Sequence, residues 1–341
     1  MNKRYSRQII FTGIGQAGQE KLGKAKVVIV GAGALGTVSA NNLVRAGVGH
    51  VRIIDRDFVE FSNLQRQSLF DENDARNTLP KAAAAVAKLK TVNCEVECEG
   101  IIGDLNSGNA VSLLSGFDLV VDGTDNFEAR FIMNDACWKL NIPWIYGGAV
   151  GASGMAAAFL PGKTGCLRCL FDSPPGPGLA PTCDTAGIIN PASGLVSALQ
   201  SAEALKILVG SSEMVNPGLV SFDLWDNRFD NFDLQSSKLK DCPCCGRRDF
   251  EFLKPQGGTK TAYLCGRDAV QVVPAEENLK LELALIAERL QMLGKVELNA
   301  FLLRFVVDNY ELVLFKDGRA IVKGTNNEGV AKGLYARYFG L

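Results

Sequence analysis

The stretch Lys26-Val27-Val28-Ile29-Val30-Gly31-Ala32-Gly33-Ala34-Leu35-Gly36 decides the fold class of this chain. Its first five residues form a short apolar run, which predicts a buried strand of a parallel sheet. The glycines follow at once and predict a tight turn, and residues 37–46 have helical spacing up to Gly47. A strand, a glycine turn and a helix in this order are typical of nucleotide-binding α/β folds.

Strands and helices continue to alternate after this unit, at the spacing of a doubly wound sheet. The segments that carry the alternation are the strands 51–55, 117–122 and 143–146 and the helices 80–90 and 192–209. Residues 211–250 look irregular and strand-like. We therefore predict an α/β, doubly wound, Rossmann-like and mostly parallel sheet in a nucleotide-binding domain at residues 1–250.

A smaller second part is expected after a linker-like stretch at 255–259, and a Pro- and Gly-rich surface loop is expected at 173–178. Residues 255–341 are predicted to form a small C-terminal α+β module. Its expected elements are a helix at 279–293, a strand at 302–307, a hairpin of 310–315 and 320–323 around Asp317-Gly318, and a last helix at 329–339.

The composition indicates a folded protein of the cytoplasm. Of 341 residues 47% are hydrophobic and 21% charged, which excludes a disordered chain. The net charge of -1 argues against a broad electrostatic surface for nucleic acid or membrane. We expect no signal peptide and no membrane span. Ten cysteines in a cytoplasmic chain favour metal binding or reactivity over disulfides.

The glycine turn is the first candidate site. Gly31, Gly33, Ala34 and Gly36 would let the backbone approach a phosphate, whose charge the helix N-terminus attracts. Asp55 follows about twenty residues later and ends the second strand, where it suits a ribose hydroxyl. A nicotinamide- or flavin-dependent dehydrogenase carries the same signature, and a plain glycine turn beside an acidic surface residue is the structural alternative.

Cationic residues that follow Asp55 weaken the dehydrogenase interpretation. Arg66 lies in Ser62-Asn63-Leu64-Gln65-Arg66-Gln67, and Lys81 opens the next expected helix. A nucleoside triphosphate carries about four negative charges, whereas a helix dipole offers only about half a positive charge. Arginine and lysine side chains would supply the remainder.

Thr124-Asp125-Asn126 follows a strand that ends at Asp122. The carboxyl ends of parallel strands are where ligands bind, and Mg²⁺ prefers carboxylate oxygens. Asp125 is therefore a candidate Mg²⁺ ligand, and Asp122 competes with it. An Asx turn or a helix cap would explain the same residues without a metal.

Two cysteine pairs, Cys166-x-x-Cys169 and Cys242-x-x-Cys245, predict a structural Zn²⁺ site. Four thiolates leave no open position for catalysis, so the metal would clip residues 242–245 onto the α/β core. Cys244 could replace a neighbour as ligand. A redox pair or free buried thiols are the alternatives.

The other cysteines and the single histidine carry weaker signals. Cys183 lies alone after the Pro- and Gly-rich loop, and its sequence favours an inert loop thiol over a nucleophile. His50 opens a strand and suits a surface or packing role. The remaining cysteines are expected to be core or structural residues: Cys94, Cys98, Cys137 and Cys265.

Together these residues resemble the ThiF/MoeB/HesA family of sulfur-carrier adenylyltransferases, which are bacterial relatives of ubiquitin-activating enzymes. The resemblance covers about residues 1–250. Its motifs are specific as a set: Arg4-Tyr5-Ser6-Arg7-Gln8-Ile9, the glycine turn, Asp55-Arg56-Asp57, the segment 62–67, Pro80-Lys81, Thr124-Asp125-Asn126 and the two cysteine pairs.

The resemblance implies a nucleotidyltransferase that uses ATP, Mg²⁺ and Zn²⁺. In the family, the C-terminal Gly-Gly carboxylate of a small ubiquitin-fold carrier attacks the α-phosphate of ATP and gives an acyl-adenylate and pyrophosphate. The family roles carried over are Asp55 on the ribose, Asn63, Arg66 and Lys81 on the phosphates, Asp125 on Mg²⁺, and Asp57 and Asn126 as further nucleotide-binding residues. Arg7 would act from the partner subunit of a homodimer.

The resemblance also suggests a branch of the family. Cys183 matches a cysteine that can link to the carrier's C-terminus in the thiamine-pathway branch, and the tail resembles that of longer bacterial members of this branch. A ThiS-like carrier in thiazole synthesis is therefore the expected partner, with a sulfurtransferase or cysteine desulfurase as a further one. A MoaD-like carrier of molybdopterin synthesis and a non-catalytic scaffold are the alternatives.

Overall fold

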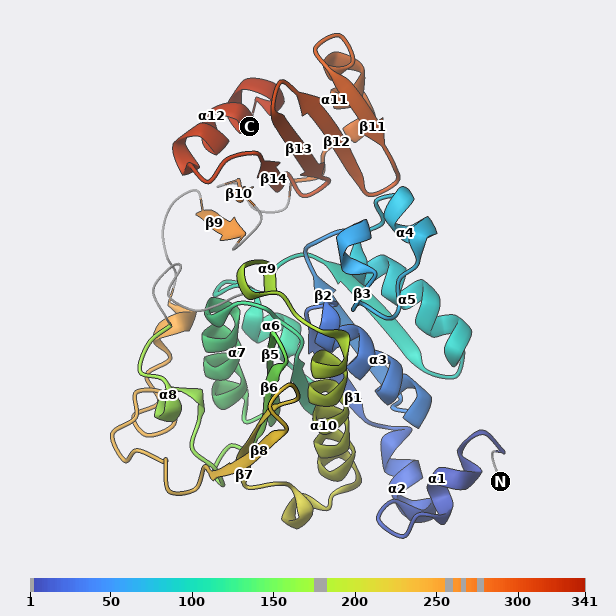
Figure 1. Cartoon of the computed structure of the whole chain (residues 1–341), viewed down its shortest axis with the longest axis vertical. Helices are drawn as coiled ribbons and strands as arrows, with labels where there is room; N and C mark the ends of the chain where they lie inside the picture. Colours follow the sequence, from blue (N-terminus) through green and yellow to red (C-terminus); the bar gives the residue numbers. More distant parts are fainter. Residues whose placement is uncertain (1–2, 175–182, 255–259, 265–267, 275–278, 341) are drawn as a thin grey trace. The chain divides into compact units, whose positions relative to one another are not determined.

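The computed structural model describes residues 3–174, 183–254, 260–264, 268–274 and 279–340. Most of the expected surface loop and the whole expected linker lie outside these residues. The chain divides into two compact units, Met1–Pro255 and Gln256–Leu341. Each unit has its own sheet, and each is described below by itself (Figure 1).

The first unit is built on an eight-stranded sheet that confirms the predicted doubly wound fold. In spatial order its strands are β3 (Glu97–Ile102), β2 (His50–Asp55), β1 (Lys26–Val30), β4 (Leu119–Asp122), β5 (Trp144–Val150), β6 (Ser153–Phe159), β7 (Gly218–Asp223) and β8 (Arg228–Asp233). The pairs from β3 to β5 are parallel, and those from β5 to β8 are antiparallel. The parallel half therefore carries the nucleotide-fold topology.

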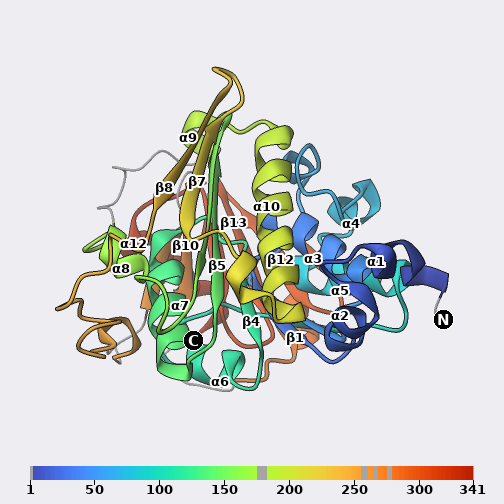
Figure 2. The same ribbon diagram turned by 90° about the horizontal axis from the view of Figure 1, so that it is seen from below.

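Helices cover both faces of this sheet, which explains why β1 is apolar and buried from Val27 to Val30. Val27 and Ile29 enter one core with α3 (Ala34–Ala46), α5 (Lys81–Val92) and α10 (Asn190–Val209). Val28 and Val30 enter the other core with α6 (Ala110–Leu114) and α7 (Phe127–Leu140). Figures 1 and 2 show the sheet between these two helical layers.

Short helices complete the unit at its margins. They are α1 (Ser6–Ile10), α2 (Gly15–Leu22), α4 (Glu72–Arg76), α8 (Leu167–Leu170) and α9 (Cys183–Ala186), with 3₁₀ turns η1 (Lys3–Tyr5), η2 (Phe61–Asn63), η3 (Ser212–Met214) and η4 (Glu251–Leu253).

Helix α10 is long and apolar enough to cross a membrane, but it lies against α3, β5 and β6 and carries polar groups into the core. Ser197 Oγ donates to the Leu35 carbonyl oxygen at 3.0 Å, and Gln200 Nε2 donates to the Asp122 carbonyl oxygen at 2.7 Å. Buried side-chain donors with such partners are typical of a core helix.

Two elements of the first unit differ from the sequence-based expectation. Helix α3 begins at Ala34 rather than at residue 37, because Gly33 is its N-cap and the helix starts directly from the glycine turn. Helix α7 was not anticipated. It is buried on nearly all sides and carries the buried polar residues Arg130, Asn134 and Asp135, so its sequence lacks an amphipathic period.

The second unit is an antiparallel sheet with two helices. Its strand order is β11 (Lys295–Leu298), β12 (Leu302–Val307), β13 (Tyr310–Phe315), β14 (Ala320–Lys323), β10 (Ala269–Val273) and β9 (Lys260–Leu264). Helices α11 (Leu283–Leu290) and α12 (Glu328–Phe339) share one core with β10 and β12 to β14. Helix α11 is shorter than the expected 279–293.

The expected hairpin of this unit is β13 and β14, with one correction to its turn. Gly318 N donates to the Phe315 carbonyl oxygen at 3.0 Å, and Gly318 has φ +82°. The two central residues of the turn are therefore Lys316 and Asp317, and the glycine follows them in the left-handed region.

Candidate functional site

The glycine turn lies at the switch point of the sheet, where β1 separates β2 on one side from β4 on the other. Ligands of doubly wound folds bind in the crevice outside the carboxyl ends of these strands. A Cβ built on Gly36 would lie 1.8 Å from the Gly31 carbonyl oxygen, so Gly36 is required for close packing inside the turn. Gly31, at φ +92°, is required for the left-handed backbone.

Gly33 is the glycine of the turn that leaves room for a ligand. Its added Cβ would meet only the Gly123 carbonyl oxygen, at an ordinary 3.7 Å. It is the N-cap of α3 and supplies no side-chain cap to the first-turn amides, which begin at Ala34. Amides at such a helix N-terminus attract phosphate oxygens.

Asp55 ties the end of β2 to the glycine turn. One of its carboxylate oxygens accepts from Ala32 N at 2.6 Å and the other from Asp57 N at 2.7 Å. Burial raises the pKa of Asp55, while the Lys81 ammonium and the two backbone amides oppose this rise. Each oxygen keeps a further lone pair, so the carboxylate can also accept a ribose hydroxyl.

Lys81 and Asp57 place a buried ion pair next to Asp55. Lys81 Nζ lies 3.4 Å from Asp57 Oδ2, and Lys81 is only 2% exposed. The Lys81 backbone N–H also donates to the Asp57 carbonyl oxygen at 2.9 Å, which anchors the start of α5 beside the end of β2. Helix α5 thus places Lys81 beside the end of β2, and the contact of Lys81 with phosphate stays a prediction.

Arg56 is a further cation that the sequence analysis left without a role. Its guanidinium lies 3.1 Å from Asp104 and 4.0 Å from Asp57. Burial lowers the pKa of Arg56, but Asp104, Asp57 and Asp125 raise it more, so that it stays protonated. The triplet Asp55-Arg56-Asp57 was its only signal in the sequence.

Asp122 and Asp125 have different environments, which separates the two candidate Mg²⁺ ligands. Asp122 is fully buried, and its carboxylate accepts from Thr124 N at 2.8 Å and from Arg130 Nε at 2.9 Å. Arg130 also donates to the Thr124 and Gly147 carbonyl oxygens, at 2.9 and 2.8 Å. Asp122 therefore organises the loop after β4 and is not available to a metal.

Asp125 is exposed at the tip of this loop, and its neighbour Asn126 is the N-cap of α7. Asn126 Oδ1 accepts from Ala129 N at 2.8 Å. The helix-cap interpretation is thus right for Asn126. It does not account for Asp125, whose side chain is exposed to solvent. A hard cation could approach it from solvent.

Asn63 and Arg66 lie on the loop between β2 and α4. Asn63 is buried and forms a capping box with Glu60, since Glu60 N donates to Asn63 Oδ1 at 3.1 Å. Arg66 Nη1 donates to the Ser62 carbonyl oxygen at 2.9 Å. Both side chains hydrogen-bond within their own loop, and their contact with phosphate stays a prediction.

Arg7 lies at the far end of α3 from the glycine turn. The next residue, Gln8, donates through Nε2 to the Ala46 carbonyl oxygen at 2.9 Å, and Ala46 is the last residue of α3. A helix of this length spans roughly 20 Å. The exposed Arg7 side chain is therefore remote from the crevice of its own chain.

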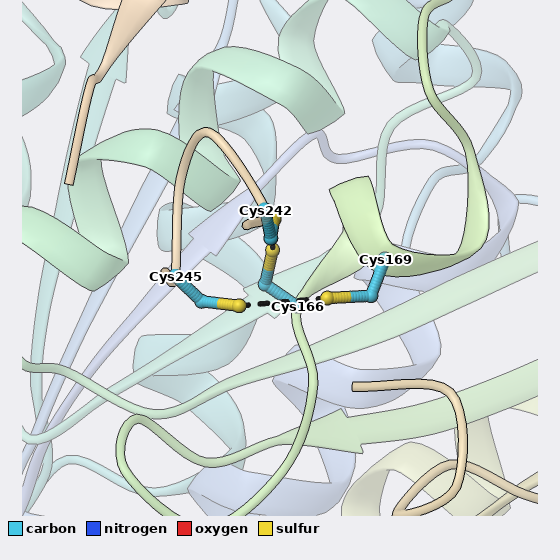
Figure 3. A group of neighbouring side chains, drawn as sticks. All are labelled: Cys166, Cys169, Cys242 and Cys245. Atoms are coloured by element: carbon cyan, nitrogen blue, oxygen red, sulfur yellow. Dashed lines mark hydrogen bonds between the residues drawn. The ribbon is translucent and has the colours of Figure 1, made fainter. Parts of the chain in front are cut away.

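The two predicted cysteine pairs come together. The sulfurs of Cys166, Cys169, Cys242 and Cys245 all lie within 4.8 Å of one another, and they converge from the start of α8 and from the 242–245 loop (Figure 3). The Cys166–Cys242 and Cys169–Cys245 sulfurs are 3.5 and 3.4 Å apart. Tetrahedral Zn²⁺ at about 2.3 Å from each sulfur needs spacings of about 3.8 Å, so the cluster fits this metal.

The remaining cysteines fall into three groups. Cys98 and Cys137 are buried as expected, but Cys94 is exposed, because it lies in the turn between α5 and β3 rather than in either element. Cys183 is the first residue of α9 instead of a loop residue. The Cys183 side chain and the whole of Cys265 lie outside the described residues.

The single histidine, His50, packs on the Phe117 ring, with 5.2 Å between the ring centroids, as expected of a packing residue.

The sequence of this chain matches a known protein family and curated proteins. The ThiF family model matches residues 5–244. The "Sulfur carrier protein ThiS adenylyltransferase" of Bacillus subtilis (strain 168) is 46% identical over 341 residues, which cover 100% of each chain. The "Sulfur carrier protein adenylyltransferase" of Thermus thermophilus is 40% identical over 248 residues, covering 71% of this chain and 90% of its own.

Solved structures have the same fold. E. coli MccB, crystallised with ATP, has a TM-score of 0.62 and 26% identity, and the match covers 72% of this chain and 75% of MccB. The residues that match the family model span the glycine turn, the loops after β2 and β4, and the cysteines up to Cys244. With this sheet, a family model that matches residues 5–244 and a relative that is 46% identical over the full length, the chain belongs to the ThiF family.

Proposed function

We propose that this protein adenylates the C-terminal carboxylate of a ThiS-like, ubiquitin-fold sulfur carrier with ATP, releasing pyrophosphate, in thiazole synthesis for thiamine. The choice of a ThiS-like carrier rests on how much of this chain each relative matches. The Bacillus relative named for ThiS matches all 341 residues, the second unit included. The Culex relative named "Adenylyltransferase and sulfurtransferase MOCS3" covers 71% of this chain, at 39% identity.

The crevice has the groups that this reaction needs. The C-terminal carboxyl group of a peptide has a pKa of about 3.5. It is therefore already an anionic nucleophile at neutral pH and needs no general base. The difficulty is to bring an anion to a polyanion and to stabilise the charge that leaves with pyrophosphate. Lys81 and Arg56, which both lie beside Asp57 at the end of β2, would supply positive charge, and the α3 N-terminus would add its amides.

Each residue then has one role. Asp55 accepts a ribose hydroxyl, while Gly33, Ala34 and Lys81 bind the phosphates together with Asn63 and Arg66 of the neighbouring loop. Asp125 holds Mg²⁺, which neutralises phosphate charge when it is bound. Asp57 keeps Lys81 in place through the 3.4 Å ion pair. Cys183 is proposed to act only in the later transfer of sulfur.

The assembly around this site is also a proposal. Zn²⁺ bound by Cys166, Cys169, Cys242 and Cys245 clips the 242–245 loop to the core and has no catalytic role. Arg7 completes the crevice of a second subunit, since it is remote from its own. The enzyme works in the cytoplasm with a sulfurtransferase or cysteine desulfurase as sulfur donor.

Carrier-dependent exchange of labelled pyrophosphate into ATP tests the function. We expect exchange with a ThiS-like carrier and weaker exchange with a MoaD-like carrier. Asp125→Ala should lower exchange at least about 100-fold with the fold intact. Glu128→Ala removes another exposed carboxylate from the first turn of α7 and should leave exchange unchanged.

Other outcomes would identify the alternatives. Exchange with the MoaD-like carrier alone would assign the enzyme to molybdopterin synthesis. Tight binding of NADH without binding of ATP would assign it to the dehydrogenases. The absence of AMP formation with any carrier would leave a scaffold role.

A further inference from the structure

The second cysteine loop contains one thiol more than the metal cluster uses. Cys242, Cys244 and Cys245 follow one another with a single proline between the first two. The four-sulfur cluster contains Cys242 and Cys245 but not Cys244. A tetrahedral site takes any thiolate within reach, so another part of the fold must select the ligand pair.

Cys244 lies close enough to compete. It is fully buried, and it lies between two members of the cluster, Cys242 and Cys245, in the chain. Neither its burial nor its place in the chain therefore keeps it out of the ligand set. Its sulfur must be held by another partner.

Helix α7 supplies this partner. Asn134 Nδ2 donates to Cys244 Sγ at 3.2 Å. The sulfur thus has a protein donor before any metal is bound, and it lies outside the four-sulfur cluster. To become a ligand, it would have to move away from this donor.

Asn134 contacts the first cysteine loop as well. Its Oδ1 accepts from Leu167 N at 3.0 Å, and Leu167 directly follows Cys166. One fully buried amide in the middle of a 14-residue helix therefore bridges both halves of the metal site. Its two ends are not interchangeable, because only the oxygen can accept from an N–H and only the nitrogen can donate to the sulfur.

We propose that Asn134 is the positioning residue that selects the ligand set: it holds Cys244 aside and aligns the Cys166 loop, so that the metal takes Cys242 and Cys245. This inference rests on the Zn²⁺ site of the proposed function. Partners of this kind tune a metal site without touching the metal, and their loss costs about 10- to 100-fold in metal affinity.

Cobalt substitution counts the thiolates in the site. Apo-protein of the full chain is titrated with Co²⁺, and the thiolate-to-cobalt charge-transfer absorbance is measured. Wild type should show four-thiolate intensity, and Cys245→Ser should show three, because Asn134 still holds Cys244. Adding Asn134→Ala to Cys245→Ser should restore four-thiolate intensity, and adding Cys244→Ala to that pair should return it to three.

Two results would overturn the selection. If Cys245→Ser alone shows four-thiolate intensity, Asn134 does not keep Cys244 out of the ligand set. If Cys245→Ser/Asn134→Ala shows three-thiolate intensity, a group other than Asn134 keeps Cys244 out. If wild type binds no Co²⁺, it is the proposed metal site that fails. Lys139→Ala, an exposed change on the same helix, is the control and should match its parent throughout.

A second measurement does not depend on the serine variant. With Cys245 intact, Asn134→Ala should release Co²⁺ to a chelator about 10-fold faster than wild type. Asn134→Ala/Cys244→Ala should release it more slowly than Asn134→Ala alone, because the competing thiol is gone. Equal rates in these two variants would show that Asn134 only supports the fold.

Discussion

Gly31 and Gly123 meet backbone to backbone at the switch point of the first unit. A Cβ built on Gly31 would lie 2.5 Å from the Gly123 carbonyl oxygen, and one built on Gly123 would lie 2.5 Å from the Gly31 carbonyl oxygen. The loops after β1 and β4 are thus in direct backbone contact beyond the carboxyl ends of these strands.

Gly123→Ala should therefore destabilise the first unit by about 1–3 kcal/mol, the usual cost of overpacking. Chemical unfolding followed by tryptophan fluorescence measures this unit alone, because Trp138, Trp144 and Trp225 all belong to it. Gly33→Ala is the matched control, since its added methyl meets only an ordinary contact at 3.7 Å. Equal stability of the two variants would show that the loops separate easily.

Lys81→Met should separate phosphate binding from folding. Methionine keeps much of the buried volume but removes the ammonium that faces Asp57, so pyrophosphate exchange should fall at least about 100-fold. Lys88→Met is the control on the same helix, where Lys88 contacts the exposed Asp71 and the buried Asp74 instead. An exchange rate that fell equally in both variants would remove Lys81 from the catalytic site.

The features predicted correctly from the sequence are those that depend on neighbouring residues. The β1 run, the turn that follows it and the spacing of Cys166 to Cys169 are local patterns, each contained in a few neighbouring residues. The structure adds a second role to the glycine pattern. Gly31 and Gly36 serve close backbone packing, whereas an added Cβ on Gly33 would meet only an ordinary contact. The approach of a phosphate to this turn stays a prediction.

The features that the sequence did not reveal depend on distant parts of the chain. Arg130 pairs with Asp122 and with a carbonyl on β5, so its role exists only once β4, β5 and α7 are assembled. The choice between Asp122 and Asp125 has the same origin, because burial separates two carboxylates that lie three residues apart. Arg56 likewise pairs with Asp104, which lies 48 residues further along the chain.

Mixed subunits test whether Arg7 acts at the partner's crevice. Arg7→Ala and Asp125→Ala should each be inactive alone. Co-expressed, they form hetero-dimers in which one crevice has both residues intact, so exchange should return to about a quarter of wild type for random pairing in a two-fold dimer. If the mixture is as inactive as its components, Arg7 does not act at the crevice of the partner subunit. A mixture of two Asp125→Ala preparations is the control.

Tyr335 should make the second unit sensitive to alkaline pH. Its hydroxyl donates to the Gly318 carbonyl oxygen at 2.6 Å, and burial raises the pKa of Tyr335 to about 12. An unfolded tyrosine ionises near about pH 10. The folded state therefore binds this proton more tightly, and its contribution is complete below about pH 10 and is lost as the pH rises towards 12.

Tyr335→Phe isolates this contribution, because phenylalanine keeps the ring but has no proton to lose. At pH 9 wild type should be more stable than the variant by about 1 kcal/mol, the net value of one hydrogen bond. The difference should shrink steadily above about pH 10 when unfolding is followed by circular dichroism in the two proteins side by side. A difference that stayed constant up to pH 12 would mean that Tyr335 has the same pKa in the folded and the unfolded state.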